Sequence, residues 1–236
     1  MNINQILVPV SIIVAGAIVA GAVYFINKSP TVTTTGADGQ SVVVRPVDSS
    51  DHIIGNPNAP IKLIEYSDME CPYCKTYHAT LKAVMSEYGA QGQVAWVFRP
   101  LPIAVLHSKA TKEAEAAECV AALGGNDAFW KFIDRVFEVT PSNNGLDLAV
   151  LPDIAQQVGG VDRAKFVECL DKGTYASKVA ASVEEATKAG IRGTPHTFIS
   201  VAGEFLPLEG SQPLSSIRSA LNLVIQQIAA SSTPLR

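Results

Sequence analysis

The feature that most constrains this chain is a pair of cysteines three positions apart, Cys71 and Cys74, between an apolar run and a helical pattern. The run "IKLIEY" (61–66) predicts a buried strand, because it is short, apolar and rich in β-prone residues. Pro72 suits the first position of the following helix, since it lacks the N–H that would find no partner there. Such a pair can bind zinc, pack in a core, or cycle between dithiol and disulfide.

A zinc site is the least favoured of these three interpretations. His78 completes a C-x2-C-x3-H spacing, but structural zinc requires a fourth ligand. The remaining cysteines, Cys119 and Cys169, are single residues rather than a second pair. We therefore expect no metal and no cofactor, and we expect His78 to be a surface residue of its helix.

The order of the predicted elements indicates an α/β domain. After the first helix, "QVAWVF" (93–98) predicts a second strand, which gives strand, helix and strand with the cysteine pair at the first junction. A long helical stretch follows at about 107–188. Two further strands, at 194–200 and 203–210, then precede a final amphipathic helix at 214–230.

Several helices are predicted within the long helical stretch. Gly124 and Gly125 end the first, and Asn126 can cap the second. The second helix has an aromatic face at 129–137, which is typical of a core. The later helices are expected at 146–158, 162–172 and 174–188.

Four separated motifs carry a family resemblance. They are "IEYSDMECPYC", "AAECV", "FVECL" and "GTPHTFI", and they occur in this order. With them the chain resembles the DsbA-like thiol–disulfide oxidoreductases over roughly residues 54–228. The resemblance implies an enzyme with an α/β thioredoxin-like fold in a domain at 54–230, with a helical insertion at about 107–188.

The resemblance also implies roles for individual residues. Cys71 and Cys74 would be the redox pair, and Glu65 a buried acid that exchanges protons with the second cysteine. Pro195 would be a cis proline that faces the pair and contacts bound substrate. The expected substrate-binding residues are Thr194, Pro72 and Tyr73.

The position of Cys71 favours a nucleophile independently of the resemblance. The attacking sulfur must be a thiolate, and a helix start stabilises an anion by up to ~2 kcal/mol, or about 1.5 pKa units. Glu70 would oppose this by like-charge repulsion if its carboxylate lay near the sulfur. Cys74 lies one turn into the helix and is better shielded, as expected of a resolving thiol.

Cys119 and Cys169 lie on apolar helix faces, where buried free cysteines are common. The resemblance implies instead a structural disulfide between two helices of the insertion. Such a bond persists in an oxidising compartment, which places the catalytic domain on the extracytoplasmic side. Lys28, the one basic residue near the N-terminal apolar run, weakly favours the opposite orientation.

Residues 6–26 form an apolar run of 21 residues without a charge. A helix of that length spans about 31 Å, close to the hydrocarbon thickness of a bilayer. The small residues at 20–22 resemble a signal-peptide cleavage site, but residues 1–5 lack Lys and Arg. We expect a retained single-pass anchor in the cell membrane, followed by a flexible linker at 27–53.

Composition argues against nucleic acid as a partner, because the net charge is −4 and no basic run is present. The expected function is an oxidase that gives its disulfide to reduced exported proteins and is reoxidised by a membrane partner. A reductase or isomerase would use the same residues. A membrane-tethered binding or chaperone module with structural cysteines is the alternative from another class.

Overall fold

The computed structural model describes residues 34–35, 41–42 and 44–231 of the 236. The predicted anchor at 6–26 lies outside the described residues. Within the described ranges, no helix is both long and apolar enough to cross a membrane. The chain divides into two units, and every residue of the candidate site belongs to the unit Thr33–Leu214.

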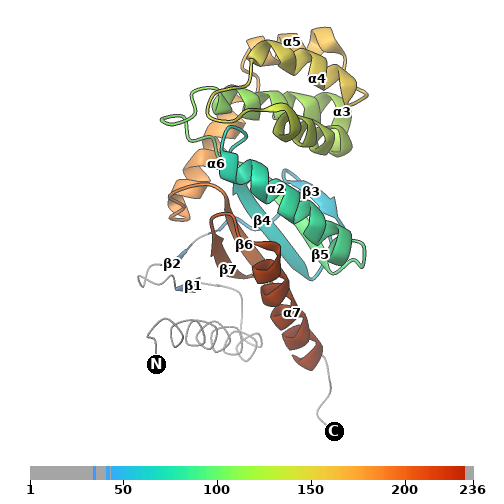
Figure 1. The fold of residues 1–236 in the computed structure, drawn as a ribbon, viewed down its shortest axis with the longest axis vertical. Helices are drawn as coiled ribbons and strands as arrows, with labels where there is room; N and C mark the ends of the chain where they lie inside the picture. Colours follow the sequence, from blue (N-terminus) through green and yellow to red (C-terminus); the bar gives the residue numbers. More distant parts are fainter. Residues whose placement is uncertain (1–33, 36–40, 43, 232–236) are drawn as a thin grey trace. The chain divides into compact units, whose positions relative to one another are not determined.

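A five-stranded sheet with the strand order β3-β5-β4-β6-β7 forms the centre of this unit (Figure 1). β4 and β5 are parallel, and the other neighbours are antiparallel. α2 (Pro72–Val84) and the π-helical turn Met85–Gly89 connect the parallel pair, which is the predicted strand–helix–strand unit. The strands are β3 His52–Gly55, β4 Ile61–Ser67, β5 Val94–Pro100, β6 His196–Val201 and β7 Glu204–Glu209. A separate pair consists of β1 Thr34–Thr35 and β2 Ser41–Val42.

The predicted helical insertion lies between β5 and β6. Its helices are α3 Ala110–Val139, α4 Leu151–Gln157, α5 Arg163–Asp171 and α6 Ala176–Lys188, with a short 3-10 turn at Leu148–Val150. α3, α4 and α5 pack together as one group (Figure 1). The break predicted at 124–126 occurs at Gly125, whose φ of 80° and ψ of −176° interrupt α3. The thioredoxin-like α/β fold with a helical insertion is therefore confirmed.

The alternation of side chains along β4 divides the core into two layers, because successive residues of a strand point to opposite faces. Tyr66 belongs to a cluster with Val97 of β5 and Ala186 of α6. Glu65 lies on the other face and is bonded to Trp96. The Trp96 ring in turn contacts aromatic rings of α2 and α3.

Residues 44–53, expected as linker, are part of the folded unit. β3 pairs antiparallel with β5 along one edge of the sheet. Arg45 makes ion pairs with Asp51 and with Glu185 of α6. The polar composition around "HIIG" indicates a loop, and the structure differs because strand and ion pairs both depend on partners far along the chain.

His78 is buried, and the expectation of a surface residue is wrong. Its side chain is 5% exposed, and Nε2 lies 2.7 Å from Asp134 of α3. Its ring also contacts those of Trp96 and Phe137. The reason is that α3 packs beside α2 and covers the helix face that carries His78.

α7 (Leu214–Ser231) follows β7 and belongs to the other unit from Ser215 onward. It buries Ile217, Leu221 and Val224, which lie on one stripe of the helix. This is the amphipathic spacing predicted from the sequence.

Candidate active site

The two cysteines lie where β4 gives way to α2. Cys71 is the extended residue immediately before the helix, with φ −79° and ψ 122°, and Pro72 takes the first helical position. Both thiols are free. Cys71 is 5% exposed and Cys74 is fully buried, so Cys71 is the sulfur that a substrate can reach.

The surroundings of Cys71 favour its thiolate. The pKa of Cys71 is lowered to about 6, chiefly by a hydrogen bond from the Cys74 thiol. Burial opposes this shift, while the N–H groups of Cys74 and Tyr73 and the side chain of Thr194 reinforce it. Cys71 is therefore largely ionised at neutral pH.

The opposite holds for Cys74. Burial raises the pKa of its thiol, and the negative charges of Cys71 and Glu65 raise it further. The N–H of Asp68, 3.5 Å from Cys74 Sγ, partly offsets these effects. The pair therefore holds its proton on the inner sulfur and its charge on the outer one.

Glu65 lies on β4 behind the redox pair and is fully buried. Trp96 Nε1 donates a hydrogen bond of 2.9 Å to its Oε2. Burial raises the pKa of Glu65 to about 7, and the neighbouring Ser67 side chain and the hydrogen bond from Trp96 moderate the shift. None of the groups that set this pKa is a cation, so Glu65 can gain or lose a proton near neutral pH.

The segment before β6 lies against the outer cysteine. Its Thr194–Pro195 peptide bond is cis. The carbonyl oxygen of Thr194 lies 3.6 Å from Cys71 Sγ. On the solvent side, Tyr73 is 69% exposed. The structure thus brings together every residue predicted for the redox site, and their roles remain predictions.

Two acids that sequence reasoning did not assign lie between β4 and Cys71. The Asp68 carboxylate accepts hydrogen bonds from the N–H groups of Glu70 and Ile103 and lies 2.9 Å from His107 Nδ1. Glu70, whose direction the sequence left open, is fully buried. The signal that could have found them is the presence of two acids between an apolar strand and an apolar helix.

The second cysteine pair is a disulfide that joins α3 to α5. Cys119 and Cys169 are separated by 50 positions, and their Cα atoms lie 6.0 Å apart. Among the described residues, no group of three or more His, Cys, Asp or Glu side chains could hold a metal ion.

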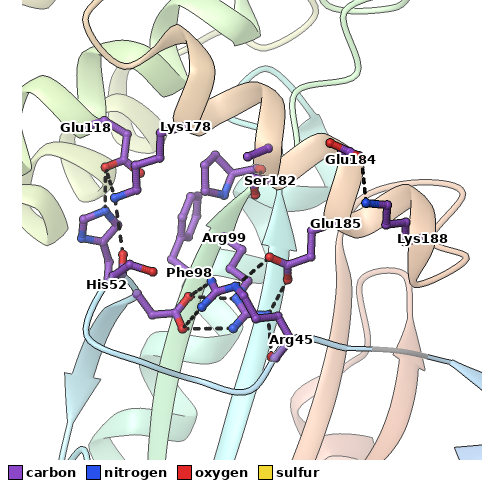
Figure 2. A pocket seen from close by; sticks show the side chains of 14 residues that line it. Arg45, His52, Phe98, Arg99, Glu118, Lys178, Ser182, Glu184, Glu185 and Lys188 are labelled. Atoms are coloured by element: carbon purple, nitrogen blue, oxygen red, sulfur yellow. Dashed lines mark hydrogen bonds and ion pairs between the residues drawn. The ribbon is translucent and has the colours of Figure 1, made fainter.

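A cavity of about 460 Å³ lies on the α6 side of the sheet, and none of the predicted redox residues lines it. Figure 2 shows that charged side chains of β5, α6 and the segment before β3 meet there. Arg99 pairs with Asp51 and with Glu185, and Lys178 pairs with Glu118. This region is a network of ion pairs, separate from the thiol chemistry.

A family model described as "Thioredoxin" matches residues 48–217. The chain therefore belongs to the thioredoxin family. Within that family it is similar to the DsbA proteins, and the resemblance drawn from the four motifs is confirmed.

Two kinds of curated relatives match. An Na(+)/H(+) antiporter, NhaA 3 of Salinispora tropica, is 33% identical over 155 residues, which are 65% of this chain and 22% of the antiporter. The chain thus spans about a fifth of the length of such relatives. Disulfide bond formation protein D of Bacillus subtilis is 24% identical over 168 residues, 70% of this chain and 74% of that protein.

Solved structures agree with the fold. DsbA2 of Pseudomonas aeruginosa matches with a TM-score of 0.62 and 27% identity, over 76% of this chain and 97% of that one. Oxidised BdbD of Bacillus subtilis matches with a TM-score of 0.67 and 23% identity, over 77% of this chain and 96% of that one.

Proposed function

We propose that this chain is a protein disulfide oxidase that transfers the Cys71–Cys74 disulfide to reduced exported proteins. The observation that carries this proposal is the unequal pair of thiols, with the pKa of Cys71 lowered to about 6 and that of Cys74 raised. A stable thiolate at Cys71 stabilises the reduced form, and a centre with a stable reduced form is a strong oxidant.

The reaction is two successive exchanges at sulfur. A substrate thiolate attacks Cys71 Sγ of the oxidised pair, the Cys71–Cys74 bond breaks, and Cys74 leaves and takes up a proton. The second substrate thiolate then attacks the substrate sulfur of the mixed disulfide, which releases Cys71 as a thiolate. The substrate loses two electrons and the redox pair gains them.

Glu65 is the proposed proton donor to the leaving Cys74. Its pKa of about 7 leaves both forms populated near neutral pH, as efficient general acid–base catalysis requires. Pro195, Thr194, Pro72 and Tyr73 are the proposed contacts for the substrate chain, since they surround the sulfur that substrate must reach.

The proposed site of action is the extracytoplasmic side of the cell membrane, with residues 6–26 as a single-pass anchor. The Cys119–Cys169 disulfide supports an oxidising compartment. The name of the Bacillus subtilis relative, disulfide bond formation protein D, supports the direction of electron flow. A membrane partner that accepts the two electrons would regenerate the disulfide.

The reduction potential tests the proposal against a reductase or isomerase, which would use the same residues. We expect equilibration with glutathione to give a potential above about −200 mV, whereas a value near that of thioredoxin, about −270 mV, would contradict the oxidase. Cys71→Ser should abolish oxidation of a reduced model protein, and Cys74→Ser should accumulate mixed disulfides. The matched control, Cys119→Ala with Cys169→Ala, should retain the exchange activity.

A further inference from the structure

The segment after α3 has an unusual backbone. Ser142, Asn143 and Asn144 have φ values of 65°, 53° and 66°, three consecutive non-glycine residues in the left-handed region. Residues other than glycine adopt this conformation at a cost, and such runs persist where the surroundings hold them. Successive N–H groups in turns of this kind converge on one point and bind an anion.

The anion at that point is the Glu70 carboxylate. Its Oε2 accepts hydrogen bonds from the N–H groups of Asn144 at 2.6 Å and Gly145 at 3.2 Å, and its Oε1 accepts one from Leu146 at 3.3 Å. The backbone carbonyl of Glu70 accepts a fourth, from Asn143 at 2.8 Å. One buried residue thus binds four successive N–H groups of residues 143–146.

Glu113 of α3 completes this arrangement. It is fully buried, and neither of its carboxyl oxygens has a hydrogen-bond partner among the described residues; burial and then the nearby Glu70 side chain raise its pKa to about 9. Asp68 raises it further and Lys109 opposes the shift. Glu113 is therefore protonated at neutral pH, which avoids a second buried negative charge beside Glu70.

The same short stretch fixes the segment before α3. The Asp68 carboxylate binds the N–H of Ile103 at 2.7 Å, and His107 lies 2.9 Å from it. Asn144 joins the two segments, because its side-chain N–H donates to the carbonyl of Leu106. Both ends of α3 are thus attached to the three residues that precede Cys71.

We propose that Glu70 is a positioning residue for the redox centre, which holds residues 143–146 beside Cys71 so that a substrate chain meets a preformed surface. The proposal rests on the redox function proposed above. It assigns Glu70 a geometric role rather than an electrostatic one, because the main groups that set the pKa of Cys71 do not include Glu70.

The exposed side chains of these segments indicate what this surface contacts. Val105 is 93% exposed and Leu106 is 68% exposed, and both belong to the segment that Asp68 and Asn144 hold. An extended polypeptide with apolar side chains near its cysteine fits such a surface. Loss of the Glu70 contacts should therefore weaken substrate binding more than it slows the exchange step.

Hydrogen exchange in the full chain tests the attachment directly. In the wild type, the amides of 144–146 should be protected although Asn144 and Gly145 lie at the surface. Glu70→Gln offers one acceptor oxygen where the carboxylate offers two, and its NH₂ group opposes an N–H. We expect exchange at 144–146 to become about tenfold faster or more.

Three variants separate a positioning role of Glu70 from other roles. Glu70→Gln should raise KM for a reduced peptide severalfold, with kcat and the pH midpoint of Cys71 alkylation unchanged. Glu113→Gln keeps a neutral side chain beside Glu70 and should retain the protection. Glu115→Gln, a matched control on α3 whose carboxylate pairs with Lys112, should change none of these quantities.

Two outcomes would overturn the proposal. One is that the wild-type amides of 144–146 exchange like those of an unfolded peptide. This test uses the wild-type protein and so does not depend on any variant folding. The other is that Glu70→Gln shifts the Cys71 midpoint and leaves exchange at 144–146 unchanged, which would make its role electrostatic. Protected amides in a chain without thiol exchange activity would instead refute the proposed function and leave the attachment standing.

Discussion

Glu65 and Tyr66 are neighbours on β4, yet they lie in opposite kinds of surroundings. On the α6 face, Tyr66 receives a hydrogen bond from Arg99 and donates one to Glu185. Arg99 also pairs with Asp51, which pairs with Arg45. On the α2 face, Glu65 is bonded to the neutral Trp96 ring and lies near the redox pair.

The pKa values of two acids, Asp51 on the α6 face and Glu65 on the α2 face, reflect this difference. Burial alone would raise the pKa of Asp51, but Arg99 and Arg45 lower it below its ordinary value. Burial raises the pKa of Glu65 to about 7, and no cation reverses the shift. A paired acid is fixed in one charge state and holds the fold together, whereas an unpaired acid can change its charge during a reaction.

The largest expected effect comes from breaking the paired face. Arg99→Met leaves the buried carboxylate of Asp51 with Arg45 alone and removes a partner from Glu185. We expect the free energy of unfolding to fall by roughly 3–5 kcal/mol, since loss of one member of a buried ion pair strands the other. Urea denaturation at neutral pH measures the change.

The control for Arg99→Met is an exposed ion pair of the same kind. Arg163→Met removes a pair with Asp153 in which both side chains are about half exposed. This should cost less than about 1 kcal/mol. Equal losses in the free energy of unfolding for the two variants would show that the buried network on the α6 face stabilises the fold no more than an exposed ion pair does.

A somewhat smaller effect of opposite sign is expected on the other face. The folded-state pKa of Glu65, about 7, lies above its ordinary value of 4.5, so stability is lost as pH rises between these two values. Glu65→Gln should therefore stabilise the protein by roughly 3 kcal/mol above pH 7 and have no effect below pH 4.

The same substitution should slow thiol exchange, because the proton donor to Cys74 is lost. Denaturation at several pH values and stopped-flow exchange kinetics measure the two effects. A Glu65→Gln variant that is less stable at pH 8 would show that the charged carboxylate contributes to the fold, as the acids of the other face do.

The smallest expected effect is a change in the titration of the redox pair itself, which is measured as the pH midpoint of Cys71 alkylation. Cys74→Ala removes the thiol that contributes most to the low pKa of Cys71, so the midpoint of alkylation should rise from about 6 towards 9. Glu185→Gln lies on the paired face and should leave that midpoint unchanged. A shift of similar size in both variants would mean that the two faces are electrically coupled through the sheet.

The sequence was sufficient for the parts of the site that depend on local order along the chain. The apolar strand, the cysteine pair and Pro72 predict a redox centre at a helix start, and the family resemblance supplied Glu65, Pro195 and the insertion. Both the fold and the resemblance to the DsbA-like proteins are confirmed. The roles of the individual site residues remain predictions.

The parts that the sequence did not predict depend on contacts between distant segments. His78 is buried because α3 packs beside it. Its hydrogen-bond partner on α3, Asp134, lies 56 positions further along the chain. Glu70 meets its partners 74 to 76 positions further along the chain. β3 has four residues and no pattern that separates it from a loop. Composition and periodicity report on neighbours and cannot identify such partners.

The alternation along β4 also makes this fold sensitive to the number of residues within the strand itself. A shift of one residue in strand pairing moves every side chain to the opposite face. Tyr66 would then lie behind Cys74, and Glu65 would face Arg99. A single-residue deletion within 61–67 should therefore destroy both the redox chemistry and the ion-pair network. The same deletion in the turn at 56–60, before the strand begins, can be absorbed without moving either residue. The spacing between Ile61 and Cys71 is thus the length that an insertion or deletion, natural or engineered, has to preserve.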